Sequence, residues 1–245
     1  MFDDVIHHGH ATTRLDAQTL MHWVSEDSCI LHVALARCSS DEENSRALIA
    51  ANAHVMRWTQ GLNKAAPQCL INHVPSYTSL LITVDLMRCD VFSVMRSLQS
   101  LALQINDNNP SEDLLSITEH VIELCYEPML ADAQLPKPNA SMLERPNDLK
   151  RVSESLSLSI TDIIAMHSEG VYRVFAVGFL PNFAYMGLTA AQLKIPRLSS
   201  PRSKVPPGAV AIADNQTAIY PQSSPGGWHI IAYTPQDLSG RGEIV

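Results

Sequence analysis

Two stretches in the first half of the chain repeat hydrophobic residues at helical spacing. Within residues 41–62 and 90–105 these residues recur every three or four positions, so each stretch has one apolar face. The two stripes consist of Leu48, Ala51, Val55, Trp58 and Leu62, and of Val91, Val94, Met95, Leu98, Leu101 and Ile105. Ser40 or Asp41 can cap the first stretch, and Gly61 is placed to end it. The pattern therefore predicts two helices.

Four short apolar runs around these helices are typical of strands. They cover residues 28–36, 69–74, 79–84 and 117–125. With the two helices they give the order strand–helix–strand–strand–helix–strand, which is the ferredoxin-like βαββαβ unit. We therefore expect residues 1–126 to form an α+β domain. This topology supports many unrelated functions and identifies none by itself.

The second half changes character. Residues 127–146 contain four prolines and no clear period, which indicates a linker or an excursion. Asn147 or Asp148 can open one short helix after it, and Ser159 can cap another. From residue 171 the chain has short apolar runs, with eight prolines between residues 181 and 235. Frequent sharp turns between short strands favour a closed or nearly closed β-barrel, so residues 147–245 are expected to form a barrel domain with leading helices.

Composition narrows the class of protein. The chain has 245 residues, 46% of them hydrophobic, and a net charge of −8. This acidity argues against a nucleic-acid or anionic-membrane partner. Residues 1–150 carry 10 Lys and Arg against 19 Asp and Glu, whereas the remainder is nearly balanced with 7 against 6. Neither a long apolar run nor a signal peptide is evident, so we expect a cytoplasmic location.

Cofactor motifs are sparse. The five cysteines form no CxxC pair, which favours reduced thiols over a disulfide framework. His7, His8 and His10 lie close together, but no metal-ligand spacing follows them, and no metal site is expected. The chain has neither GxxxxGK[ST] nor GxGxxG, so it shows no familiar phosphate-binding motif.

Four motifs in order within about 60 residues carry a family resemblance. They are GFxPxFxY from Gly178, PRxxxPRxxVPxG from Pro196, QTxxYP from Gln216 and SPGGW from Ser224. On these motifs the chain resembles the family of the B-type subunit of 5-oxoprolinase, also called allophanate hydrolase subunit 1. A weaker likeness begins at His73, so the resemblance spans about residues 70–238.

The resemblance implies a cyclophilin-like β-barrel in the C-terminal half and an α+β domain before it. It also implies a chain that is inactive alone and works with C-type and A-type 5-oxoprolinase subunits. The family's complex hydrolyses 5-oxo-L-proline, a small cyclic amide, to L-glutamate. It does so with ATP and Mg, which the complex uses although this chain carries no nucleotide motif.

Several residues of the matched motifs are candidates for the site. Arg197 and Arg202 are five residues apart in a proline-fixed segment and could converge on a substrate carboxylate or a phosphoryl group. They could equally pair with the acidic first domain. His167 has a suitable ordinary pKa for a general acid or base, or it could be a packed residue at a helix end.

Neutral and aromatic residues complete the predicted site. The expected substrate-binding residues also include Gln216, Thr217, Tyr220, Tyr185 and Trp228. Pocket-shaping or partner-contacting roles are expected for Phe179, Pro181, Asn182, Pro225, Gly226 and Gly227. Structural hydrogen bonding and core packing are the alternatives for both groups.

The chain departs from the family pattern at a few positions. The family normally has Ser at Ala209, usually Arg at Tyr233, and Gly at three positions, here Asn182, Asp214 and Ala232. An ATP-dependent 5-oxoprolinase component is the first hypothesis. A protein that binds and inhibits a sensor histidine kinase is the second, because an inhibitor need not keep a catalytic surface. The carboxyltransferase component of a urea or amide carboxylase is the third.

Overall fold

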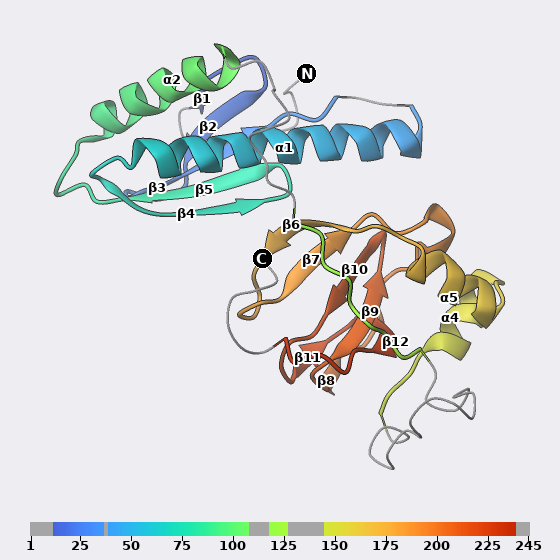
Figure 1. Cartoon of the computed structure of the whole chain (residues 1–245). Coiled ribbons are helices and arrows are strands. Elements are labelled where there is room, and N and C mark those ends of the chain that lie inside the picture. Colours follow the sequence, from blue (N-terminus) through green and yellow to red (C-terminus); the bar gives the residue numbers. More distant parts are fainter. Residues whose placement is uncertain (1–11, 37–38, 108–117, 127–144, 239–245) are drawn as a thin grey trace. The chain divides into compact units, whose positions relative to one another are not determined.

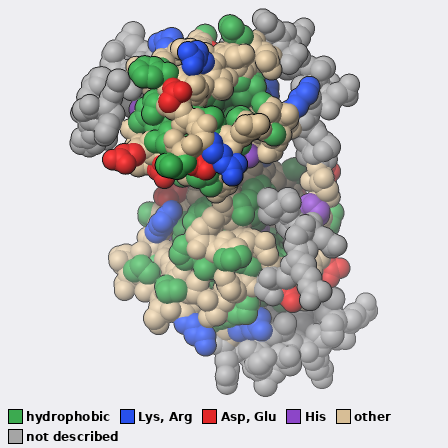
Figure 2. Space-filling model, turned by 90° about the vertical axis from the view of Figure 1, so that its left-hand side faces the viewer, with side chains coloured by type: hydrophobic (Ala, Val, Ile, Leu, Met, Phe, Trp, Pro, Cys, Tyr) green, Lys and Arg blue, Asp and Glu red, His purple; other side chains and the backbone are tan. Residues whose placement is uncertain are grey.

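The computed structural model describes residues 12–36, 39–107, 118–126 and 145–238 (Figure 1). The chain divides into two compact units, Met1–Ile117 and Thr118–Val245. Each unit combines helices with antiparallel strands, so the α+β class is confirmed at this level. Figure 2 shows one face of each unit, with hydrophobic side chains reaching the surface on both.

The first unit is an antiparallel sheet with two helices against one face. Its strand order is β1-β2-β3-β5-β4. The strands are β1 (Thr12–Arg14), β2 (Thr19–Trp23), β3 (Ser28–Val33), β4 (Leu70–Ser76) and β5 (Ser79–Val84). In β3 and β5 every second residue is buried, and these residues pack against α1 (Asp41–Ala65) and α2 (Val91–Asp107). The strand period of two thus supplies one apolar face for both helices.

The predicted helices are confirmed, but Gly61 does not end the first. Ser40 caps α1, its hydroxyl accepting a hydrogen bond from the Glu43 backbone N–H. The helix runs on to Ala65 and stops at Ala66, which has a left-handed φ of 40°. A Cβ at Gly61 would lie 2.9 Å from Leu101 of α2. The absence of a side chain at Gly61 therefore allows α1 and α2 to pack closely.

The last strand predicted for this unit is wrong. Residue 117 lies outside the described residues, and residues 118–126 contain only an isolated bridge between Cys125 and Tyr233. Ile122 and Leu124 pack into the core of the second unit. The sheet position next to β3 is taken instead by β2, which the sequence pattern did not reveal. The segment 127–146, expected to be a linker, lies outside the described residues up to 144.

The described residues of the second unit form five antiparallel strands in one sheet and a small pair of strands. The larger sheet has the order β6-β7-β10-β9-β12, and β11 pairs with β8. The strands are β6 (Arg173–Val177), β7 (Ala184–Gly187), β8 (Arg202–Val205), β9 (Ala209–Ala213), β10 (Gln216–Ile219), β11 (Ser224–Gly226) and β12 (His229–Tyr233). Every residue of β9 and β12 is buried, so these strands form the centre of the unit. Closure into a cyclophilin-like barrel stays a prediction.

Helices cover one side of this sheet. They are α4 (Leu149–Leu156), α5 (Ile160–Ser168) and the short 3₁₀ helix η2 (Ala191–Leu193). Ser159 caps α5 as predicted, its hydroxyl accepting from the Asp162 N–H at 3.0 Å. Apolar residues of the helices pack on Ile212 and Ile231 of the sheet. None of the helices in the described part of the chain is long and apolar enough to cross a membrane.

Candidate functional site

A cation lies against an aromatic wall in the second unit. Arg197, in the segment between η2 and β8, places its guanidinium carbon 5.6 Å from the centre of the Trp228 ring. The Arg197 side chain is 59% exposed, and its Nε is 3.9 Å from a carboxylate oxygen of the exposed Asp214. A guanidinium over an indole face gains a cation–π interaction, and its N–H groups other than that of Nε can still donate to an anion.

The wall is a connected cluster of aromatic side chains. Phe183 lies at its centre and is 2% exposed. Its ring centroid is 4.8 Å from that of Tyr185, 5.2 Å from that of Tyr220 and 6.4 Å from that of Trp228, all in edge-to-face geometry. Tyr185 lies in β7 and Phe183 directly precedes that strand, whereas Tyr220 directly follows β10 and Trp228 directly precedes β12. The fold therefore brings together three separate sequence motifs at one place.

The aromatic cluster also carries polar atoms on three of its side chains. In the part of the chain that the structure describes, the Tyr185 hydroxyl, the Tyr220 hydroxyl and Trp228 Nε1 make no hydrogen bond to another residue. Burial raises the pKa of Tyr220, so its phenol stays protonated as a donor. Together with Arg197, these groups offer one cation and three neutral donors to a small ligand.

Glycine at position 226 is required by this arrangement. A Cβ there would lie 2.3 Å from the Tyr220 hydroxyl oxygen. Gly227 accepts a backbone hydrogen bond from Leu198, and Pro225 is exposed in β11. The SPGGW motif thus shapes the backbone beside Tyr220 and Trp228.

Arg202 is engaged with a carboxylate. Its Nη2 donates to Asp148 Oδ1 at 2.6 Å, and its Nη1 lies 3.4 Å from the Trp228 carbonyl. The Arg202 side chain is 24% exposed and that of Asp148 is 8% exposed. Arg197 and Arg202 both lie beside Trp228, as their spacing suggested, but the charge of Arg202 is balanced internally. Arg197 is therefore the better candidate for anion binding.

His167 is part of a buried hydrogen-bonded chain. The Tyr126 hydroxyl is 2.6 Å from His167 Nδ1, and His167 Nε2 is 2.9 Å from the Thr217 hydroxyl. Thr217 donates its own proton to the Ala211 carbonyl, so Nε2 must carry the imidazole proton. Burial lowers the pKa of His167 to about 4. Both ring nitrogens are engaged inside the fold, and the catalytic role of His167 and the substrate role of Thr217 stay predictions.

The remaining predicted residues lie around the cluster. Phe179 is 61% exposed and makes an edge contact with Phe183 at 5.4 Å. Phe179 and Asn182 have left-handed φ values of 71° and 63° in one tight turn, with the exposed Pro181 between them. Gln216 begins β10 and pairs with Gly187 of β7. Their predicted roles remain open.

Two departures from the family pattern have structural counterparts. Ala209 is fully buried in the core of the second unit. Tyr233 is 5% exposed, donates its hydroxyl proton to the Pro146 carbonyl at 2.7 Å, and has the Arg145 guanidinium 5.2 Å from its ring centre. Arg145 therefore supplies a cation beside the position where the family usually has one.

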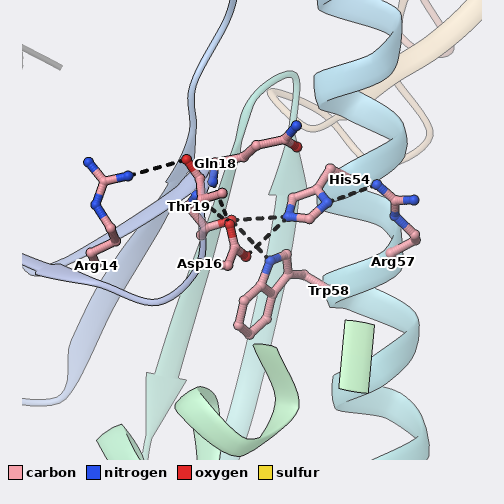
Figure 3. A network of polar contacts seen from close by, with 8 residues as sticks. Arg14, Asp16, Gln18, Thr19, His54, Arg57 and Trp58 are labelled. Atoms are coloured by element: carbon pink, nitrogen blue, oxygen red, sulfur yellow. Dashed lines mark hydrogen bonds and ion pairs between the residues drawn. The ribbon is translucent and has the colours of Figure 1, made fainter. Parts of the chain in front are cut away.

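Sequence reasoning missed a buried polar cluster in the first unit (Figure 3). His54 Nε2 lies 3.3 Å from the Asp16 carboxylate and 3.1 Å from the Thr19 hydroxyl. Arg57 is 2.9 Å from His54 Nδ1, and because a guanidinium only donates, Nε2 carries the proton. Trp58 Nε1 also donates to Thr19. No spacing motif links positions 38 residues apart, so only the fold shows this cluster.

The cluster holds α1 to the turn before β2. Burial alone would raise the pKa of Asp16, but the hydrogen bonds from His54 and from the Gln18 and Thr19 backbone N–H groups lower it to about 2. His54, Thr19 and Trp58 are each less than 4% exposed. The cluster is thus closed to a ligand. Among the described residues, no group of three His, Cys, Asp or Glu side chains could hold a metal ion.

The fold and these motifs define a carboxyltransferase-type domain. The family model described as carboxyltransferase domain, subdomain C and D, matches residues 23–241, and the chain belongs to this family. Three curated relatives are each named as the B-type subunit of 5-oxoprolinase. The protein of Bacillus subtilis is 33% identical over 69% of this chain and 66% of its own length. That of Haemophilus influenzae is 44% identical over 41% of this chain and 47% of its own length.

Solved structures carry the same fold within longer chains. A crystal structure of TTHA0988 matches 86% of this chain with a TM-score of 0.62 and 26% identity, and the match covers 35% of that chain. The urea carboxylase of Kluyveromyces lactis matches 91% of this chain with a TM-score of 0.56 and 12% identity, over 20% of its length. The matches to the first curated relatives likewise span less than two thirds of their lengths.

Proposed function

We propose that this chain is the B-type component of an ATP-dependent 5-oxoprolinase and helps to bind 5-oxo-L-proline for hydrolysis to L-glutamate. The names of the curated relatives support the complex. The observation that carries the substrate assignment is the exposed guanidinium of Arg197 over Trp228, beside the hydroxyls of Tyr185 and Tyr220. A planar five-membered lactam with one carboxylate fits this set of groups.

Each group has a defined task in this proposal. The Arg197 fork binds the substrate carboxylate, since a planar guanidinium matches a carboxylate in two parallel hydrogen bonds. The Trp228 ring borders the flat lactam, and the Tyr185 and Tyr220 hydroxyls donate to its amide oxygen. These two donors orient the amide oxygen for phosphoryl transfer from ATP.

In this proposal ATP binds to a partner subunit and not to this chain. ATP, with Mg, would transfer its γ-phosphoryl group to the amide oxygen, with ADP leaving, which makes the ring carbon electrophilic. Water then adds to that carbon and the ring C–N bond breaks, with the proton going to the nitrogen. A second water releases phosphate from the resulting acyl phosphate to give L-glutamate. The described residues offer neither a phosphate-binding glycine motif nor a cluster of carboxylates for Mg. We therefore assign the nucleotide to a C-type or A-type partner, with which this chain forms the active complex.

Reconstitution tests the proposal directly. The chain is purified with C-type and A-type partner subunits, and glutamate release from 5-oxo-L-proline is measured with ATP. We expect release only when all components are present. Arg197→Ala should lower kcat/KM by about tenfold or more, the usual effect of losing a charge-assisted hydrogen bond. Arg46→Ala, which removes an exposed arginine of α1, is the matched control.

Two other results would redirect the assignment. Unchanged turnover in Arg197→Ala would show that Arg197 does not bind the substrate. Carboxylation of urea or an amide with a biotin-carrying partner would favour the carboxylase alternative, for which the fold shared with the Kluyveromyces lactis enzyme is the supporting observation. Loss of sensor-kinase autophosphorylation on addition of the chain, without glutamate release, would favour the inhibitor alternative.

A further inference from the structure

The segment that carries Arg197 is fixed by hydrogen bonds on both sides of that residue. The carbonyl of Pro196 lies 3.0 Å from His229 Nε2. The backbone N–H of Leu198 donates to the Gly227 carbonyl at 2.7 Å. Both contacts lead to residues that directly flank Trp228. The residues just before and after Trp228 therefore fix the backbone of the segment that carries Arg197.

The contact from His229 has a single possible polarity. A carbonyl oxygen only accepts, so His229 Nε2 carries the proton and donates it to Pro196. His229 is 4% exposed, and its Cα pairs with that of Ile212 in β9. Its Nδ1 is buried without a partner among the described residues. The chain thus keeps a polar ring inside an apolar strand and uses its one donor on the Arg197 segment.

Pro196 can be held through its backbone only at the carbonyl. Pro196 has no backbone N–H to donate. The backbones of Ile195 and Asp214 bond to each other on the preceding side, which anchors the entry to the segment. A backbone that is already fixed removes the backbone part of the ordering cost when a ligand binds to Arg197.

We propose that His229 is a positioning residue that fixes Arg197 over the Trp228 ring. The contribution of His229 to substrate binding rests on the proposed function. The position of Arg197 over the Trp228 ring does not depend on that function. Loss of the Nε2–H donor frees the Pro196 carbonyl and lets the guanidinium leave the ring. The Leu198–Gly227 bond and the Ile195–Asp214 pair keep the rest of the segment in place.

The placement can be read from the ring of Trp228. The full chain is labelled with 5-fluorotryptophan, which gives one ¹⁹F resonance for each of its three tryptophans. Trp228→Phe identifies the resonance of Trp228, and Arg197→Ala shows where it moves when the guanidinium is absent. We expect His229→Leu to move it most of the way to the Arg197→Ala position. His229→Gln, whose amide N–H can reach the same carbonyl, should leave it near the wild-type position.

Controls separate positioning from general damage. His73→Leu, a substitution of a half-buried histidine in β4, should not move the Trp228 resonance. The resonances of Trp23 and Trp58 report the fold of the first unit in every variant. If His229→Leu fails to fold, His229→Asn takes its place, because it keeps a polar group but is too short to reach Pro196. A folded His229→Leu or His229→Asn chain with an unmoved Trp228 resonance would overturn the proposal.

The reconstituted complex supplies an independent readout. His229→Leu should raise KM for 5-oxo-L-proline about fivefold, the usual effect of one neutral hydrogen bond, with restoration in His229→Gln. Absence of glutamate release from every form of the complex would reject the proposed function, while the ¹⁹F shifts would still decide whether His229 places Arg197.

Discussion

The carboxylate of Asp148 lies 2.6 Å from the guanidinium of Arg202, and its second oxygen accepts from the backbone N–H of Ile230 at 2.8 Å. The backbone N–H of Asp148 also donates to the Ile230 carbonyl. One buried aspartate therefore ties the start of α4 to β12 and neutralises an arginine from β8. The main role of Arg202 is therefore to stabilise the second unit through its ion pair with Asp148.

Removal of Arg202 should destabilise the second unit. Arg202→Ala leaves the Asp148 carboxylate buried without its cation, and breaking such a pair costs about 3 kcal/mol. Urea unfolding of the full chain measures the loss. Arg46→Ala, which breaks an exposed pair with Glu42, should cost less than about 1 kcal/mol. A loss in Arg202→Ala no larger than in this control would contradict the structural role.

Gly226→Ala should disturb the candidate site. The new Cβ would meet the Tyr220 hydroxyl at 2.3 Å, so the buried ring or β11 must move, at about 1–3 kcal/mol. Thermal unfolding gives the stability change, and glutamate release by the complex gives the effect on the site. Gly178→Ala is the matched control, because a Cβ at that position has no heavy atom within 4 Å. Equal behaviour of the two variants would argue against close packing at position 226.

The Asp16 cluster should make stability depend on acid pH. The pKa of Asp16 is about 2 in the folded chain against an ordinary value of 3.8. A lowered pKa stabilises the fold above the ordinary value, and the contribution, about 2 kcal/mol, disappears as the pH falls from about 4 to 2. Asp16→Asn should flatten this part of the urea-unfolding profile, whereas the exposed Asp41→Asn should not. A wild-type slope retained in Asp16→Asn would exclude Asp16 as its source.

His167 should stay neutral in mildly acidic solution. Burial lowers its pKa from 6.5 to about 4, so the fold binds fewer protons than the unfolded chain between these two pH values. Stability should therefore decline as the pH falls through this range. Long-range ¹H–¹⁵N spectra of the imidazole should show the Nε2–H tautomer at about pH 6, with Thr217→Val removing the acceptor at Nε2. A doubly protonated ring under these conditions would contradict this assignment.

Local sequence patterns predicted the α-helices and several strands of the fold. The stripe from Leu48 to Leu62 predicted α1 because helical periodicity is read from neighbouring residues alone. The alternation in residues 79–84 predicted β5 for the same reason. Strand β2 was missed, and residues 118–125 were placed in the wrong unit, because choice of a sheet partner depends on residues far away in the chain.

Part of the candidate site was predictable from the sequence and part of it was not. The motifs around Arg197, Tyr220 and Trp228 were evident in the sequence, and the fold brings them together. Asp148 and His229 were not recognised as partners of that site, since no local spacing connects them to Arg202 or Pro196. Partners 33 and 54 residues apart become visible only when their atoms are placed.

The amino-acid sequence by itself determined the α-helices α1, α2, α4 and α5, the strands β3, β4 and β5, and the family, because these follow from local spacing and from residue types in order. Only the tertiary structure decided which of two arginines can still bind an anion from solution. Arg197 and Arg202 are alike in sequence, but burial beside Asp148 neutralises one and exposure over Trp228 leaves the other open to solvent. That difference arises from distances between side chains, which no linear pattern contains.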